Sequence, residues 1–239
     1  MDAIILFVII ILIASILQTS TGFGFSIMAT PFLMLIFEPR EAIQINLILS
    51  LIISCVLIRK IRKDVDWSIF KRFVIGSIAG LPLGIVIFRL INMAHLKLVV
   101  GFLIIILTFL LILSFRLNQS KSRDFLVGGL SGMFTTSIGM PGPPLLLYFS
   151  GTNTNKEILR GTTLAFYLFI YLASLVFQVV FSGTSKEIWL SSLGALPIVI
   201  AGLIIGQIIF KWISQRAFQV LTYILLFISG GYLIYQQLF

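Results

Sequence analysis

Two short stretches hold most of the residues in this chain that could bind a ligand. They lie at 19–26 and 135–144, and each interrupts a long apolar segment with hydroxyl-bearing residues and glycines. In membrane proteins, interrupted hydrophobic segments at matching positions of two halves point to a substrate site. We call these stretches the first break and the second break. Their candidate binding residues are Thr19, Ser20, Thr21, Gly22, Gly24 and Ser26 in the first, and Thr136, Ser137, Gly139, Pro141 and Gly142 in the second.

The residue types in the breaks favour binding of an anion. If a short helix starts at each break, its unpaired N–H groups and the positive end of its dipole point there. Hydroxyl side chains can donate further hydrogen bonds, and glycines let a ligand approach the backbone. Polar residues at the start of the span after each break are expected at the mouth of the same pocket: Gln44, Asn46, Arg160 and Thr162. The alternative interpretation is that these glycines and hydroxyls only allow helices to pack closely.

Other kinds of site find little support in the sequence. The chain has one histidine (His95) and one cysteine (Cys55), and its eight acidic residues all fall at segment ends. These residues cannot assemble a metal site or a nucleophile–base pair. No buried carboxylate is expected as a proton carrier. We therefore predict a protein that is not an enzyme and binds no metal or cofactor.

The composition is that of a membrane protein. Hydrophobic residues make up 59% of the 239 residues, charged residues only 10%, and the mean hydropathy is +1.14. A soluble domain carries about 25% charged residues. The net charge of +9 would suggest a nucleic-acid partner in a soluble chain, but here the basic residues lie in short loops, where they set membrane orientation. The expected partner is the lipid bilayer, and no nucleic acid is expected.

The apolar runs predict an all-α integral membrane protein built from two repeats, each a re-entrant helical hairpin followed by three transmembrane helices. Repeat 1 covers 1–115, with a hairpin at 3–37 and spans near 42–58, 73–88 and 98–115. After a cytoplasmic connector at 116–124, repeat 2 covers 125–239, with a hairpin at 125–150 and spans near 162–181, 189–210 and 218–235. The arms 3–17 and 27–37 are each short for a full span, which favours a hairpin over a kinked crossing.

A local sequence match supports the duplication. Residues 79–91 align with 201–213 at a constant offset of 122, and seven of the thirteen positions are identical. The two breaks recur at an offset near 117. The matched segments share the pattern A-G-L-x-x-G-x-x-I-F-[R/K]-x-I.

Charge distribution predicts that the repeats are inverted. With re-entrant hairpins each repeat crosses the membrane three times, and only four of the 17 basic residues then lie outside: Arg40, Arg89, Lys97 and Lys186. With four crossings per repeat the repeats are parallel, and seven basic residues lie outside. Because cytoplasmic loops carry an excess of Lys and Arg, the inverted arrangement is preferred. It places both termini outside and the basic loops in the cytoplasm.

The chain resembles the sulfite exporter TauE/SafE family of bacterial membrane permeases over nearly its whole length. The resemblance rests on six motifs: Gly22-Phe-Gly-Phe-Ser-x4-Pro31-Phe-Leu, Pro39-Arg-Glu-Ala, Asn46-Leu, Asp66-Trp67, Gly80-Leu-Pro-Leu-Gly84 and Gly139-Met-Pro-Gly-Pro-Pro-Leu. Family members often carry a run of glycines in the first motif, where this chain interleaves Phe23 and Phe25.

The resemblance implies a secondary transporter in the bacterial inner membrane that exports small sulfur-containing anions, such as sulfite or organosulfonates. That expectation agrees with an anion pocket between the two breaks. Two other functions stay open at this point: a membrane scaffold or complex subunit that transports nothing, and a small-anion channel. The exact substrate, the direction of transport, the coupling ion and the oligomeric state do not follow from the sequence.

Overall fold

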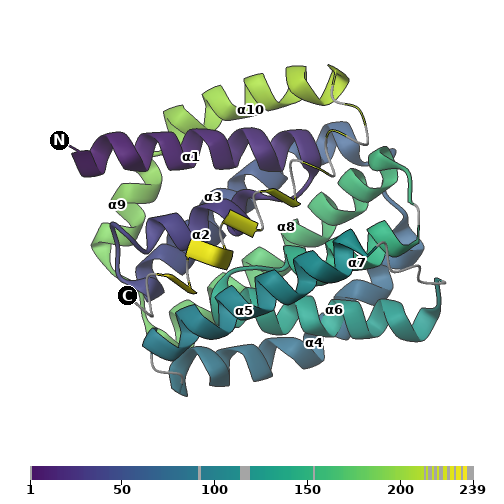
Figure 1. Ribbon diagram of the computed structural model, residues 1–239, viewed down its shortest axis with the longest axis horizontal. Helices are drawn as coiled ribbons and strands as arrows, with labels where there is room; N and C mark the ends of the chain where they lie inside the picture. The colour runs from purple at the N-terminus through teal and green to yellow at the C-terminus, as the bar shows by residue number, and fades with distance from the viewer. Residues whose placement is uncertain are drawn as a thin grey trace.

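The protein is a bundle of α-helices in the computed structural model, which describes residues 2–90, 93–113, 119–152 and 154–212 and scattered positions from 214 to 235 (Figure 1). The structure describes only scattered positions of the predicted span near 218–235, and residues 116–118 of the predicted connector lie outside the described residues. No strand occurs in the described ranges. The helices are α1 (Asp2–Thr21), α2 (Phe25–Leu33), α3 (Pro39–Ile61), α4 (Trp67–Leu90), α5 (Met93–Ile112), α6 (Lys121–Ile138), α7 (Gly142–Gly151), α8 (Lys156–Ser182), α9 (Lys186–Gly194) and α10 (Leu196–Trp212).

The all-helical membrane class predicted from composition is confirmed. Four of the described helices are long and apolar enough to cross a bilayer, namely α1, α3, α4 and α8. The bent pair α9 and α10 makes a fifth if it forms one span. Many large apolar side chains point outward from these helices, such as Ile78, Leu83 and Val180. In a membrane, lipid tails would cover these side chains.

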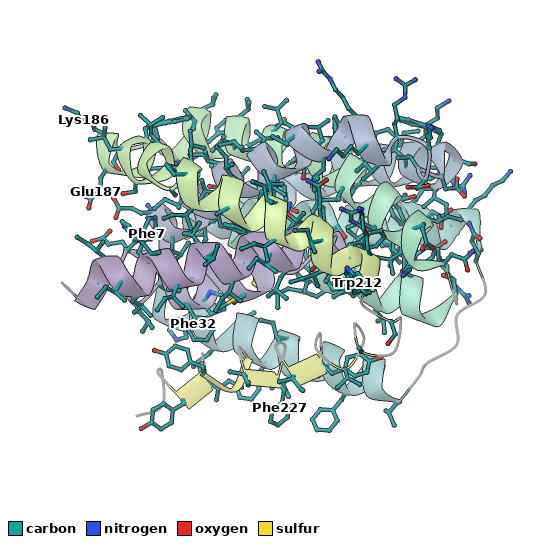
Figure 2. The ribbon with its side chains drawn as sticks, turned by 90° about the horizontal axis from the view of Figure 1, so that it is seen from above. Phe7, Phe32, Lys186, Glu187, Trp212 and Phe227 are labelled. Carbon is teal, nitrogen blue, oxygen red and sulfur yellow. The ribbon has the colours of Figure 1, made fainter. Side chains whose placement is uncertain are left out.

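The segment predicted as one span near 189–210 is two helices that meet at Ala195 with a bend of 45°. Pro197 lies in the first turn of α10. Because proline has no N–H and its ring clashes with the carbonyl four residues earlier, it favours a bend at this point. Figure 2 shows Lys186, at the start of α9, at one end of the molecule and Trp212, at the end of α10, well away from it.

The first predicted hairpin differs in length from its prediction. α1 continues to Thr21, so the expectation that the first arm is too short for a span is wrong. In this last turn the buried hydroxyls of Ser20 and Thr21 are satisfied by donating to the carbonyls of Ile16 and Leu17 in the preceding turn.

The chain nevertheless returns to its starting end. The rings of Phe7 and Phe37 lie 5.7 Å apart, centroid to centroid. Thirty residues of continuous helix would separate these positions by about 45 Å.

The second break separates α6 from α7, and their outer ends also lie side by side. Tyr148 near the end of α7 donates a hydrogen bond to Asp124 in the first turn of α6. Asp124 also forms an ion pair with Arg72 of α4 at 2.5 Å. The carboxylate is fully buried, although Asp124 falls at the end of a segment, as all the acidic residues do in the sequence. Its position at a helix end did not expose it, because α4 and α7 cover that end.

Two closely packed helix pairs form opposite sides of the bundle, α1 with α10 and α4 with α6 (Figure 1). Glycines let the backbones touch in both pairs. A Cβ on Gly84 of α4 would lie 2.7 Å from Cβ of Thr136 in α6. A Cβ on Gly206 of α10 would lie 2.6 Å from Cβ of Thr19 in α1. Gly84 and Gly206 are related by the offset of 122, and Thr19 and Thr136 by 117, so the two contacts are equivalent. Helices α3 and α8 pack together between the pairs.

Candidate functional site

The first break is a tight glycine turn from which α2 starts. Gly22 and Gly24 have φ of +86° and +110°, the left-handed region that favours glycine. Gly24 is the N-cap of α2 and no side chain caps the helix, so its first N–H groups have no side-chain acceptor. Thr19, Ser20, Thr21 and Ser26 are all at most 3% exposed. The break therefore presents a buried helix N-terminus with uncapped donors.

The second break ends α6 with Gly139 in the left-handed conformation, φ +72°. Pro141 follows, and Gly142 begins α7. Pro143 and Pro144 occupy the first turn of α7 and have no N–H to donate. The N-terminus of α7 therefore offers fewer backbone donors than that of α2, although both helices start at a break as predicted.

The two breaks meet inside the bundle. A Cβ on Gly142 would lie 3.2 Å from Cδ1 of Ile27, which is in the first turn of α2. The same Cβ would lie 3.0 Å from the hydroxyl oxygen of Tyr167, on α8. The N-termini of α2 and α7 are thus in contact, and a tyrosine hydroxyl from α8 lies beside them.

Buried hydroxyl groups without hydrogen-bond partners gather where the breaks meet. Ser26, Tyr167 and Tyr171 are fully buried, and none of their hydroxyl oxygens has a partner in the described part of the chain. The rings of Tyr167 and Tyr171 are 4.9 Å apart, and the Tyr171 hydroxyl lies near those of Ser26 and Ser50 without the geometry of a hydrogen bond to either. Because unpaired buried polar groups are unfavourable, such a group of hydroxyls is typical of a site that a polar ligand completes.

Sequence reasoning missed the two tyrosines. They are spaced i, i+4 on one face of a strongly apolar span, at 167 and 171. Tyrosine in the middle of a span, away from the interfacial belt, was the signal that could have identified them.

Each break is also held by a helix that the sequence assigns to the other repeat. Asn46 of α3 donates from Nδ2 to the carbonyl of Gly139 at 2.7 Å. Arg160 of α8 donates from Nε to the carbonyl of Thr19 at 2.9 Å. A Cβ on Gly22 would lie only 2.7 Å from Cα of Arg160, so only glycine fits there. Asn46 and Arg160, both predicted as site residues, therefore contact the breaks directly.

Several other predicted site residues have hydroxyl groups that donate within their own helix. Ser20, Thr21, Thr136 and Ser137 donate to carbonyls three or four residues earlier, so their oxygens remain available only as acceptors. Thr136 also pairs with Ser174 of α8 at 2.8 Å. The Thr19 hydroxyl is buried without a partner in the described ranges.

Two predicted site residues bind elsewhere. Gln44 donates from Nε2 to the carbonyl of Gly183 at 2.9 Å, at the far end of α8. Thr162 accepts a hydrogen bond from the backbone N–H of Asp66 at 2.9 Å and so holds the α3–α4 loop.

The residues where the breaks meet are thus buried and uncharged. Helix N–H groups and hydroxyls gather there, and Arg160 lies at the border. Across the described residues, no group of three or more His, Cys, Asp or Glu side chains is placed to hold a metal ion. Such a set of donors is suited to a small oxyanion, whose oxygens accept several hydrogen bonds at once.

Comparison with known proteins agrees with this chemistry. The model of the family described as sulfite exporter TauE/SafE matches residues 7–233, nearly the whole chain. No match was found among curated proteins or among solved structures. The match includes both breaks, all ten helices apart from the first residues of α1, and every predicted site residue. The chain therefore belongs to the sulfite exporter TauE/SafE family of membrane transporters.

Proposed function

We propose that the protein is a secondary transporter that exports small sulfur-containing anions, such as sulfite or organosulfonates, across the bacterial inner membrane. The substrate binds between the first and second breaks. The observation that carries the proposal is the contact between the N-termini of α2 and α7, together with the unpartnered buried hydroxyls of Ser26, Tyr167 and Tyr171. The family match supports the same class of substrate.

The architecture we propose is two inverted repeats with opposed re-entrant hairpins. The contacts Phe7–Phe37 and Asp124–Tyr148 support hairpins, because each brings the two ends of a broken segment together. The equivalent glycine contacts in α1–α10 and α4–α6 support the repeat. Figure 2 shows most nitrogen-tipped side chains at the end of the molecule opposite Lys186, which supports a cytoplasmic basic end.

Transport by this site requires movement of the helices. The described residues around the breaks are almost completely buried, so an anion held there is closed off from both sides. Arg160 and Asn46 each link a break of one repeat to a helix of the other. Relative motion of the repeats would break one of these two hydrogen bonds at a time. The site would then open to one side of the membrane and afterwards to the other, which is alternating access.

The membrane potential can drive export without a coupling ion. A cell interior at −100 mV favours outward movement of each negative charge by about 2.3 kcal/mol. The buried carboxylate of Asp124 is already paired with Arg72 and Tyr148 and lies at the far ends of α6 and α7 from the second break. We therefore assign Asp124 a structural role and no role in proton coupling.

The test is substrate binding and transport by purified protein. Thermal unfolding in detergent is measured against sulfite, sulfate, thiosulfate, taurine, sulfoacetate and chloride, and efflux of ³⁵S-sulfite is measured in proteoliposomes. Ser26→Ala and Tyr171→Phe each remove one hydroxyl where the breaks meet and should weaken binding about fivefold to tenfold. The matched control is Ser192→Ala in α9, which removes an equally buried, unpartnered hydroxyl remote from the breaks.

Stabilisation by one or two sulfur oxyanions that is lost in the two site variants and kept in the control supports the proposal. A folded protein that responds to no anion and carries none would instead be a scaffold or complex subunit. Flux that does not saturate and shows no counterflow would indicate a channel.

A further inference from the structure

A cavity lined by both polar and apolar residues opens at the basic end of the molecule, where α3 and α10 end and α8 begins. Its volume is about 400 Å³. We call it the basic pocket. Its polar lining consists of Lys60, Asp64, Arg160, Gln207 and Lys211. Three cations face one carboxylate, so the pocket carries a net positive charge and attracts anions from the adjoining water.

Arg160 lines the basic pocket and also contacts the first break. Its side chain is 8% exposed, and its guanidinium plane stacks on the ring of Phe210 at 4.1 Å. Only Nε is engaged, by the carbonyl of Thr19. The terminal nitrogens donate to none of the described residues, and no carboxylate in those ranges lies within 4.0 Å. A buried guanidinium with a free edge is suited to bidentate binding of an oxyanion.

The two lysines lie at the rim of the pocket. Lys60 donates to Oε1 of Gln207 at 2.5 Å, which orients its ammonium group along the pocket wall. Lys211 is exposed at the end of α10. Neither lysine contacts the first break, so the rim and the break can be altered separately.

The opposite end of the molecule has a related arrangement. Lys156 lies over the ring of Phe210 at 5.3 Å, and Arg40 lies over the ring of Phe88 at 5.6 Å. Arg40 precedes Lys156 by 116 residues, and Phe88 precedes Phe210 by 122, so these pairs are equivalent in the two repeats.

The two ends differ at one equivalent position. Arg160 corresponds to Gln44, which carries no charge and bonds to the carbonyl of Gly183. The basic end therefore has a buried cation beside its break that the other end does not have.

We propose that the basic pocket is a second oxyanion site, a vestibule that concentrates substrate and passes it to the first break by way of Arg160. The inference rests on the proposed function and adds an entry site to it. The ligand class is a small oxyanion with at least two acceptor oxygens. Arg160 also donates to the carbonyl of Thr19, so an anion bound to its terminal nitrogens is already next to the first break. Because only this end has the extra cation, substrate is captured more tightly here than at the Gln44 end.

The test measures ³⁵S-sulfite binding to the full-length protein in nanodiscs of neutral phosphatidylcholine, at low and high salt. The double variant Lys60→Gln/Lys211→Gln should raise the Kd at low salt about tenfold, and the difference should shrink at high salt, where charges are screened. Lys186→Gln, at the other end of the molecule, is the matched control and should bind as the wild type does. Gln44→Arg should raise the affinity measured from the Lys186 side in proteoliposomes.

The outcomes separate the vestibule from the proposed function. If wild-type protein binds and transports sulfite but the double variant keeps the same Kd at low salt, the vestibule is wrong and the proposed function stands. If wild-type protein neither binds nor transports any sulfur anion, the proposed function fails first. A third arm adds phosphatidylglycerol to the nanodiscs. If this lipid alone abolishes the effect of the lysine substitutions, the pocket holds a lipid phosphate, and the vestibule is again overturned.

Discussion

Nε of Arg160 donates a hydrogen bond to the carbonyl oxygen of Thr19 at 2.9 Å, joining residues 141 positions apart in the chain. The carbonyl belongs to the last turn of α1, directly before the glycine turn of the first break. The contact therefore fixes where α1 stops and α2 starts. It also places the guanidinium between the candidate site and the basic pocket.

We expect Arg160→Lys to lower the rate of sulfite efflux about tenfold or more. Lysine keeps the charge but has no Nε at the required position and no planar fork for an oxyanion. Initial rates in proteoliposomes measure the effect. Arg59→Lys, on an exposed position at the end of α3, is the control and should transport normally. Wild-type rates in Arg160→Lys would show that charge alone suffices and that the contact with Thr19 is dispensable.

The glycine contacts between helices predict a stability effect. Gly84→Ala places Cβ 2.5 Å from the carbonyl oxygen of Met133 and should destabilise the protein by about 1–3 kcal/mol, because the helices must separate. Gly206→Ala should behave alike, since its Cβ would meet Thr19 at 2.6 Å. Gly194→Ala is the control, with no neighbour within 4 Å, and should be neutral or stabilising by up to about 1 kcal/mol. Thermal unfolding in detergent measures all three, and equal melting temperatures would contradict the close packing.

The ion pair of Arg72 with the buried Asp124 should contribute far more to stability than the exposed pair of Lys156 with Glu157. Asp124→Asn removes the buried charge that pairs with the partly buried Arg72 and should destabilise the protein by up to about 3–5 kcal/mol. Glu157→Gln removes a carboxylate that is half exposed and 3.9 Å from Lys156, and should change stability by less than about 1 kcal/mol. Denaturant unfolding of the two variants gives the comparison. Similar small effects would mean that the carboxylate of Asp124 is solvated in the native protein.

A crosslinking experiment tests the return of the first segment. In a Cys55→Ser background, Phe7→Cys/Phe37→Cys should react with a short bismaleimide to give an intramolecular link, because the native rings are 5.7 Å apart. The control pair Phe7→Cys/Arg59→Cys joins opposite ends of the bundle and should not link. A continuous crossing would hold positions 7 and 37 about 45 Å apart, and the first pair would then fail to react.

Local features of the sequence were sufficient to predict the membrane class and the positions of the two breaks. A helix needs about 20 apolar residues to span a bilayer, so composition alone separates this chain from soluble proteins. Glycines that adopt positive φ, such as Gly22 and Gly139, are visible because few other residues take that conformation. The repeat was predicted from a matched pattern that contains Gly84 and Gly206, and each of these glycines makes a close contact with a threonine on a neighbouring helix. These properties depend on neighbouring residues or on a repeated pattern.

The tertiary structure alone decided which polar groups face one another. In the sequence, Tyr167 and Tyr171 look like ordinary residues of an apolar span. Only the packing of α8 beside the breaks shows that their hydroxyls face the candidate site. Asp124 reads as an exposed helix start until α4 and α7 cover it. The sequence predicted that Arg160 and Asn46 matter, but not that each holds the break of the other repeat. Such contacts join residues that are tens to more than a hundred positions apart in the chain. Because the apolar spans have similar compositions, their local sequences do not indicate which helices pack against one another.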